Sequence, residues 1–226
     1  IRFGHESRVC LLGALDAPAR FVPIDISGEH LLAAATALRK AHPALEVQPV
    51  VGDFTRDLSL PTAAGRRVGF FPGSSIGNFD PPHAVELLRR FGSLLAGGGL
   101  LIGVDLVKDP ALLHAAYNDS TGVTAAFNLN LWARASREAG ADFDLSQWFH
   151  SAFYNAPLQR IEMHLVSRRA QRVTVAGESF EFAEGASVHT ENSYKYTVAG
   201  FQALARAAGF SSAARWTGRA NRFALR

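Results

Sequence analysis

Apolar residues in the first half of the chain fall into short, nearly continuous runs that alternate with stretches of helical period. The runs cover residues 21–27, 47–54, 67–71 and 100–106, and residues 2–4 fit the end of one more. Runs of this length without polar alternation are typical of parallel strands that are buried on both faces. Strands that alternate with helices predict an α/β fold built on a parallel sheet.

Helical spacing is clearest after Ser27 and after Pro81. Apolar side chains recur every three or four residues in both stretches: Leu31, Ala35 and Leu38 in the first, and Val85, Leu88, Phe91 and Leu95 in the second. Ser27 is a typical N-cap, and proline is well tolerated in the first turn of a helix. We therefore expect a helix after each of these two residues.

The pattern changes from Asp109 onward. Pro110 opens a long alanine-rich segment that reaches about Gly140 with a break near Gly122. Residues 159–169 and 172–183 then alternate between apolar and polar side chains, which predicts paired antiparallel strands. A last helix ends at Gly209, and a hairpin of residues 213–217 and 221–225 closes the chain. The resulting regions are an α/β core over residues 1–109, a smaller α+β region over residues 110–196, and a C-terminal helix and hairpin over residues 197–226 that return to the core.

Composition excludes several classes of protein. The 226 residues are 48% hydrophobic, enough for one good-sized core, and the longest apolar runs fall short of the roughly 20 residues that a membrane helix needs. The single cysteine excludes a disulfide framework and fits a reducing, cytoplasmic compartment, and no metal site is indicated. The basic residues after Glu191 are dispersed among apolar ones, which is typical of a solvated face. We predict a monomer without a nucleic-acid or membrane partner.

Two aspartates stand at the ends of consecutive predicted strands. Asp25 ends the first of them, and Asp53 ends the second and is followed by Phe54. An acid at this edge of a sheet suits the ribose hydroxyls of a dinucleotide or of S-adenosylmethionine. An acid followed by an aromatic residue favours the second, because Asp53 can accept from the adenine amino group while Phe54 packs on the ring. Taken singly, each aspartate is more often a turn or helix cap.

Glycines interrupt the chain at two further strand ends. Gly4 opens a short turn that lacks the glycine-rich loop needed for a pyrophosphate, so S-adenosylmethionine is favoured over a nicotinamide cofactor. Gly73 begins a small-residue stretch that ends in Asn78, where bare backbone can approach a ligand closely. Asn78 offers a donor and an acceptor to that crevice, or else it caps the following helix.

Several sequence blocks stand in register with a known family. They are residues 51–54, 73–78, 103–109, 117–119, 122–128 and 188–196. Together they resemble the L-histidine Nα-methyltransferases of ergothioneine biosynthesis, in order from Phe21 to the C-terminus. The resemblance implies a class I methyltransferase-like (Rossmann-like) sheet that binds S-adenosylmethionine, with a smaller α+β lobe that binds the substrate. It implies methylation of the α-amino group of L-histidine to the trimethylated betaine.

The resemblance also implies roles for individual residues. Gly4, Asp25, Asp53 and Phe54 match cofactor-binding positions, and Gly73, Asn78, Tyr117, Glu191 and Ser193 match substrate-binding positions, with Asn78, Tyr117 and Glu191 at the reacting centre. In the family Asn78 and Tyr117 match residues that bind the backbone end of the amino acid. Glu191 and Ser193 match those that hold the imidazole. An acid and a hydroxyl two residues apart on a strand point the same way and can read both imidazole nitrogens.

The chain departs from the family pattern at its start. Family members carry a preceding segment with aromatic residues that close over the histidine, and their glycine-rich loop is shortened here around Gly4. These differences predict weak cofactor binding. Alternative functions are a catalytically impaired binding domain and a methyltransferase for another amino acid or a macromolecule. A dinucleotide oxidoreductase is also an alternative. Glu191 would repel phosphate, which counts against a nucleic-acid substrate.

Overall fold

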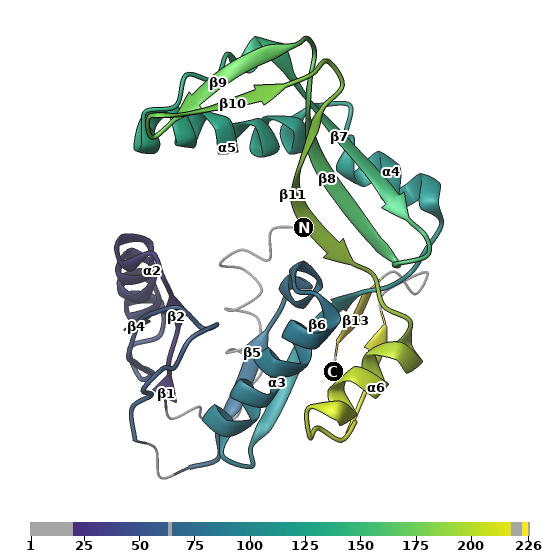
Figure 1. Cartoon of the computed structure of the whole chain (residues 1–226). Helices are drawn as coiled ribbons and strands as arrows, with labels where there is room; N and C mark the ends of the chain where they lie inside the picture. The colour runs from purple at the N-terminus through teal and green to yellow at the C-terminus, as the bar shows by residue number, and fades with distance from the viewer. Residues whose placement is uncertain (1–19, 63–64, 218–222, 226) are drawn as a thin grey trace.

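The computed structural model describes residues 20–62, 65–217 and 223–225. Within these residues the chain has a mixed α/β architecture, which Figure 1 shows as three groups of elements. The first group holds the earliest helix and short strands. The second combines strands from the middle and the end of the chain, and the third is an antiparallel sheet with its own helices. The strand expected at residues 2–4 lies outside the described residues.

The first group consists of short parallel pairs under one helix. β1 (Arg20–Phe21) pairs with β3 (Glu46–Val47), and β2 (Ile24–Asp25) pairs with β4 (Val50–Val51). α2 (Gly28–Ala41) buries the three apolar residues expected from its spacing. The runs at residues 21–27 and 47–54 are thus each split in two, because Pro23 and Pro49 have no N–H to donate to a strand partner.

The second group is a sheet with the strand order β12-β13-β6-β5. β5 (Val68–Phe71) and β6 (Gly99–Asp105) are parallel, whereas β13 (Phe223–Leu225) is antiparallel to β6 and to β12 (Trp216–Thr217). The C-terminal hairpin is therefore confirmed. Among the described strands, none joins β5 to the parallel pairs of the first group.

α3 (Pro81–Leu95) and α6 (Val198–Ala207) pack on the second group and enclose its core. α3 buries Ala84, Leu87, Leu88, Phe91 and Leu95, which recur at helical spacing. Each of the leucine and phenylalanine side chains contributes about 1.5–3 kcal/mol when it is fully buried. The helix ends at Ala96 in a left-handed conformation, and Gly98 follows because a Cβ there would collide with the Arg67 carbonyl. The turn thus returns the chain directly into β6.

The third group contains helices α4 (Pro110–Tyr117) and α5 (Val123–Ala139), separated at Gly122 as expected. Its sheet has the order β11-β8-β7, with β7 (Trp148–Asn155), β8 (Arg160–Ser167) and β11 (Ser187–Tyr194) antiparallel. A short 3-10 helix, η2 (Leu145–Gln147), precedes β7.

The expected pairing of residues 159–169 with residues 172–183 is wrong. The first run pairs with β7 and β11, and the second folds on itself as β9 (Gln171–Val175) and β10 (Glu178–Phe182). Ala176 and Gly177 have φ values of 50° and 86°. Two positive φ values in a two-residue turn favour a tight hairpin. The turn therefore pairs β9 with β10, whereas the alternation of apolar and polar residues did not determine which strand each one pairs with.

Candidate functional site

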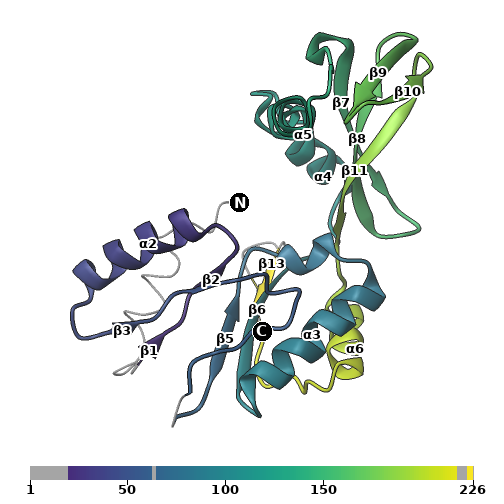
Figure 2. The same cartoon turned by 60° about the vertical axis from the view of Figure 1, so that its left-hand side comes forward.

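β11 links the antiparallel sheet to the end of β6 (Figures 1 and 2). The Tyr196 N–H donates to the Asp105 carbonyl at 3.0 Å, and the Val107 N–H donates to the Tyr196 carbonyl at 3.0 Å. Residues at the end of β11 therefore lie beside the carboxyl end of β6. That edge is where open α/β sheets bind ligands.

A bulge in β11 decides which side chains face the helices. Ser193 pairs with Ile161 and Glu191 pairs with Met163, while His189 pairs with His164, and the register shifts between His189 and Glu191. Ile161 and Met163 belong to the buried cluster that Tyr117 of α4 packs against. Glu191 and Ser193 thus share this face, as their spacing predicted. His189 lies on the opposite face.

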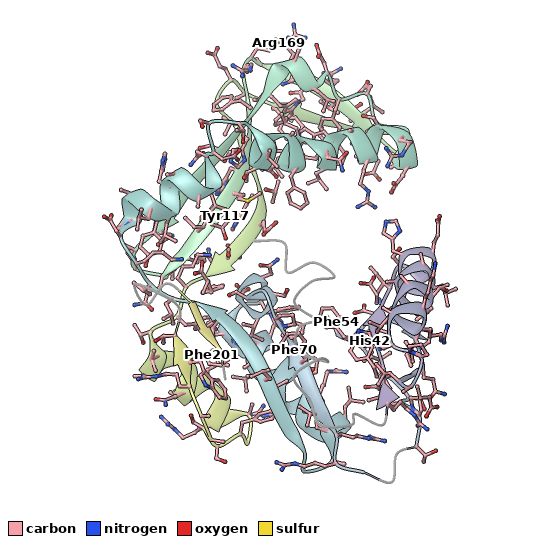
Figure 3. The ribbon with its side chains drawn as sticks, turned by 180° about the vertical axis from the view of Figure 1, so that it is seen from behind. His42, Phe54, Phe70, Tyr117, Arg169 and Phe201 are labelled. Atoms are coloured by element: carbon pink, nitrogen blue, oxygen red, sulfur yellow. The ribbon has the colours of Figure 1, made fainter. Side chains whose placement is uncertain are left out.

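Tyr117, Ser193 and Lys195 form a hydrogen-bonded triangle. The Tyr117 hydroxyl donates to Ser193 Oγ at 2.7 Å, and Lys195 Nζ donates to Tyr117 Oη at 2.8 Å and to Ser193 Oγ at 2.7 Å. Figure 3 shows Tyr117 between its helix and the sheet. The Lys195 side chain is only 1% exposed. Two expected substrate-binding residues are therefore held together by a buried cation.

Asp105 supplies the counter-charge from the end of β6. Its Oδ2 lies 3.1 Å from Lys195 Nζ, and Lys108 pairs with its other oxygen. The Asp105 N–H donates to Ser74 Oγ at 2.7 Å. Lys195 and Asp105 were not among the site residues expected from the sequence. Two signals were present, because Asp105 ends a strand like Asp25 and Asp53, and Lys195 continues the alternation of Glu191 and Ser193.

Glu191 is a half-buried acid on the same face. Burial raises the pKa of its carboxyl above the usual value, and the nearby Lys195 charge opposes that rise. A carboxylate that has lost part of its hydration gains from a donor that replaces the water. An imidazole N–H is such a donor.

The turn that contains Gly73 and Asn78 packs directly on β11. Gly73 and Ser74 have φ values of 81° and 59°, and η1 (Ser75–Asn78) follows. A Cβ on Gly77 would lie 2.7 Å from the Tyr194 carbonyl oxygen, so only glycine allows this contact without movement. Asn78 is an exposed residue at the end of η1. Asp80, rather than Asn78, is the N-cap residue of α3.

The expected cofactor residues lie at the carboxyl ends of β2 and β4, except Gly4, which is outside the described residues. Asp25 accepts from the Ser27 N–H at 2.8 Å, and Asp53 accepts from the Thr55 N–H at 2.9 Å. Hydrogen bonds from Thr55 keep the pKa of Asp53 below its usual value. Both aspartates therefore cap local turns, which is the role that the sequence offered as the alternative to cofactor binding.

Phe54 lies between the first and second groups (Figure 3). Its ring centroid is 5.5 Å from that of Phe71 and 6.4 Å from that of Phe91. It therefore packs at the end of β5, next to Asp53. A carboxylate has several lone pairs, so a turn hydrogen bond leaves acceptor capacity for ribose or adenine. The residues present at this edge fit S-adenosylmethionine.

Comparison with known proteins shows which family the chain belongs to. The model of the histidine-specific, S-adenosylmethionine-dependent methyltransferases matches residues 5–226. The histidine N-alpha-methyltransferase of Mycolicibacterium smegmatis is 41% identical over an alignment of 226 positions that covers 98% of this chain and 70% of that protein. That of Mycobacterium tuberculosis is 41% identical over 91% of this chain and 65% of its own length. Ergothioneine biosynthesis protein 1 of Neurospora crassa is 29% identical over 64% of this chain and 17% of its own length.

The class defined by these matches is that of the S-adenosylmethionine-dependent methyltransferases. Within that class, the chain belongs to the histidine-specific methyltransferase family. It spans about two thirds of the length of the mycobacterial relatives. In the part of the chain that the structure describes, no helix has both the length and the apolar character to cross a bilayer.

Proposed function

We propose that this chain methylates the α-amino group of L-histidine to the trimethylated betaine, as a step of ergothioneine biosynthesis. One observation carries the proposal. Glu191 and Ser193 share a face of β11, and Lys195 ties Ser193 to Tyr117 of α4. Family membership over residues 5–226 supports the assignment of that face to histidine.

The arrangement suits recognition of an imidazole. Glu191 accepts from one ring nitrogen, and Ser193 bonds the other, so the two sides of the ring are distinguished. Tyr117 and Asn78 bind the amino and carboxyl groups of the substrate from α4 and η1. A site built to pair both ring nitrogens rejects side chains that leave one of its polar groups unpaired.

S-Adenosylmethionine supplies a methyl group bound to a positively charged sulfur. Asp25 and Asp53 would hold its ribose and adenine, and Phe54 would pack beside the ring. A neutral amine is already a good nucleophile, so the residues of the chain mainly align the substrate and exclude water. Neither a covalent intermediate nor an obligatory general base is required. Glu191, Tyr117 and Asn78 act by orientation.

The strand order supports a class I methyltransferase-like, Rossmann-like core. β5 and β6 are parallel, β1 to β4 form parallel pairs, and the antiparallel hairpin is at one end of its sheet. We assign cofactor binding to residues 1–109 and substrate binding to residues 110–196, with residues 197–226 completing the core. The monomeric state, the cytoplasmic location and the absence of a nucleic-acid partner stay predictions.

Isothermal titration tests the assignment of the two ligands. S-Adenosylhomocysteine is titrated first and L-histidine second, on the chain and on Asp53→Ala, Glu191→Ala and Glu178→Ala. We expect Asp53→Ala to weaken the first ligand and Glu191→Ala to weaken histidine about 10- to 100-fold, the loss of a charge-assisted hydrogen bond. Glu178 is an exposed acid of β10, so its variant should behave as wild type. Unchanged histidine affinity in Glu191→Ala would overturn the proposal.

A further inference from the structure

The face of the antiparallel sheet opposite Glu191 and Ser193 carries a second group of chemically active side chains. Glu162 and His164 are two residues apart on β8, and His189 of β11 is the direct cross-strand partner of His164. Side chains two apart on a strand, and those directly opposite on its neighbour, stand on the same face. The bulge that turns Glu191 toward α4 leaves His189 on this side.

The ligand atoms of these three residues are already close together. One nitrogen from each histidine and one oxygen of Glu162 lie within 4.8 Å of one another. The rings of His164 and His189 stack with centroids 4.7 Å apart and an interplanar angle of 11°. Among the residues that the structure describes, no other three His, Cys, Asp or Glu residues meet this criterion.

The two ring nitrogens of His164 make only one long hydrogen bond within the group. His164 Nε2 is 3.4 Å from Glu162 Oε2, which is long for a hydrogen bond to a carboxylate. His164 Nδ1 is buried and has no hydrogen-bond partner. The ring is stacked between Phe153 and His189, but a buried nitrogen without a hydrogen-bond partner is costly, so a ligand that binds this nitrogen would stabilise the ring.

Hydrogen bonds fix the Glu162 side chain with one oxygen directed at the histidines. Its Oε1 accepts from Arg160 Nε at 2.8 Å and from Asn155 Nδ2 at 2.9 Å, while Oε2 faces His164. Arg160 Nη2 also lies 2.7 Å from Oε1, so this oxygen is fully engaged. Fixing one oxygen from outside is how partner groups orient a metal-binding carboxylate.

We propose that Glu162, His164 and His189 form a binding site for a divalent transition-metal ion such as Zn²⁺. Two imidazoles and one carboxylate suit Zn²⁺, and the exposed side of His189 leaves room for water as the fourth ligand. Hard cations such as Mg²⁺ prefer oxygen ligands and are not expected here. The ion would cross-link β8 to β11. This site is distinct from the proposed methyl-transfer site, because its side chains lie on the other face of the sheet; the two touch only where His189 Nε2 lies 3.2 Å from the Glu191 carbonyl oxygen.

The test is titration of the whole chain, freed of metal by chelation, with Zn²⁺ and with Mg²⁺. His189→Ala removes an exposed ligand whose contacts are the His164 ring and the Glu191 carbonyl, and His83→Ala removes an exposed histidine of α3 as a control. We expect one Zn²⁺ per chain that His189→Ala weakens at least ~10-fold and His83→Ala leaves unchanged. Mg²⁺ should not compete.

Thermal unfolding separates loss of the site from loss of the fold. Without metal, His189→Ala should remain folded and unfold at a temperature close to that of the wild type, because His189 is exposed and makes only the stacking contact and one hydrogen bond. Zn²⁺ should raise the Tm of the wild type and of His83→Ala but not that of His189→Ala, because an ion that binds only the native state stabilises it. Zn²⁺ affinity of His189→Ala equal to that of the wild type, or failure of the wild type to bind Zn²⁺, would overturn the proposal.

Discussion

Two oppositely charged side chains, Glu191 of β11 and Lys195 just after it, are withdrawn from water at the candidate site. Lys195 is almost fully buried and is matched by Asp105, Tyr117 and Ser193. Among the described residues none hydrogen-bonds to the Glu191 carboxylate, although its backbone carbonyl lies 3.2 Å from His189 Nε2, and burial raises the pKa of the carboxyl. Burial of this acid without a hydrogen-bond partner lowers the stability of the protein, and a ligand that donates a hydrogen bond to it would restore that stability. Such acids are typical of binding sites.

Replacement of Glu191 by glutamine should change how stability depends on pH. A carboxyl with a raised pKa in the folded state favours folding while it is protonated, and this contribution is lost as the pH rises through the folded-state pKa. Glu191→Gln stays neutral throughout. We therefore expect the Tm of Glu191→Gln, relative to that of the wild type, to rise as the pH increases from about 4 to about 8. The rise should be roughly 2–4 °C for each kcal/mol of unfolding free energy that the wild type loses. A difference in Tm that does not vary with pH would contradict the account of Glu191.

Replacement of Lys195 by alanine should destabilise the protein strongly. The change leaves Asp105 and two hydroxyl groups without their partner in a buried place, which costs about 3 kcal/mol even with Lys108 still present. Urea denaturation measures the loss. Lys40→Ala, at an exposed position of α2, should stay within about 0.5 kcal/mol of the wild type. A loss below ~1 kcal/mol for Lys195→Ala would show that the network contributes little.

The residue pattern predicted Glu191 and Ser193 better than it predicted their partners. Side chains two apart on a strand share a face, and the structure confirms this for the pair. Lys195 was missed because lysine is almost never fully buried unless it is paired. Its partners come from α4 and β6, and no local pattern brings those segments together.

At the scale of elements, the contact between η1 and β11 sets the distance between Asn78 and the face that carries Ser193. Gly77 makes this contact possible. Periodicity located the turn and the strand separately. It did not show that they touch, because the contact depends on where β11 leaves the antiparallel sheet.

Gly77→Ala should therefore push η1 away from β11. A Cβ 2.7 Å from the Tyr194 carbonyl forces a backbone shift that costs about 1–3 kcal/mol and weakens histidine binding. Gly92→Ala is a matched control, since its Cβ would lie 3.7 Å from Phe210 and it removes a glycine from the interior of α3. That change should be neutral or stabilising by up to about 1 kcal/mol. Chemical denaturation and histidine titration of both variants check the contrast, and equal behaviour would contradict it.

Strand pairing was the weakest part of the prediction. β7 was not predicted, although it completes the antiparallel sheet beside β8. Alternation identifies the buried face of a strand but not its neighbour, which depends on turn geometry and on the other strands. The tight turn at Ala176 and Gly177 pairs β9 with β10 and so leaves β8 to pair with β7 and β11.

At the scale of the whole molecule, β11 joins the two parts of the candidate site. It begins in the antiparallel sheet and ends against β6 (Figure 2). Tyr117 and Ser193 from one group therefore meet Asp105 from the other through Lys195. The alternation of strands and helices predicted the α/β class, and the described parallel pairs agree with it. The arrangement of the three groups in space depends on long-range contacts, which local sequence patterns do not predict.

Methyl transfer to L-histidine is the most direct measurement of the central claim. The chain is incubated with S-adenosylmethionine and L-histidine, and mass spectrometry follows the methylated forms, with histamine and L-phenylalanine as comparison substrates. We predict mono-, di- and trimethylated histidine, little transfer to either comparison substrate, and loss of transfer in Glu191→Ala. Equal methylation of L-phenylalanine, or transfer that does not depend on Glu191, would contradict the account.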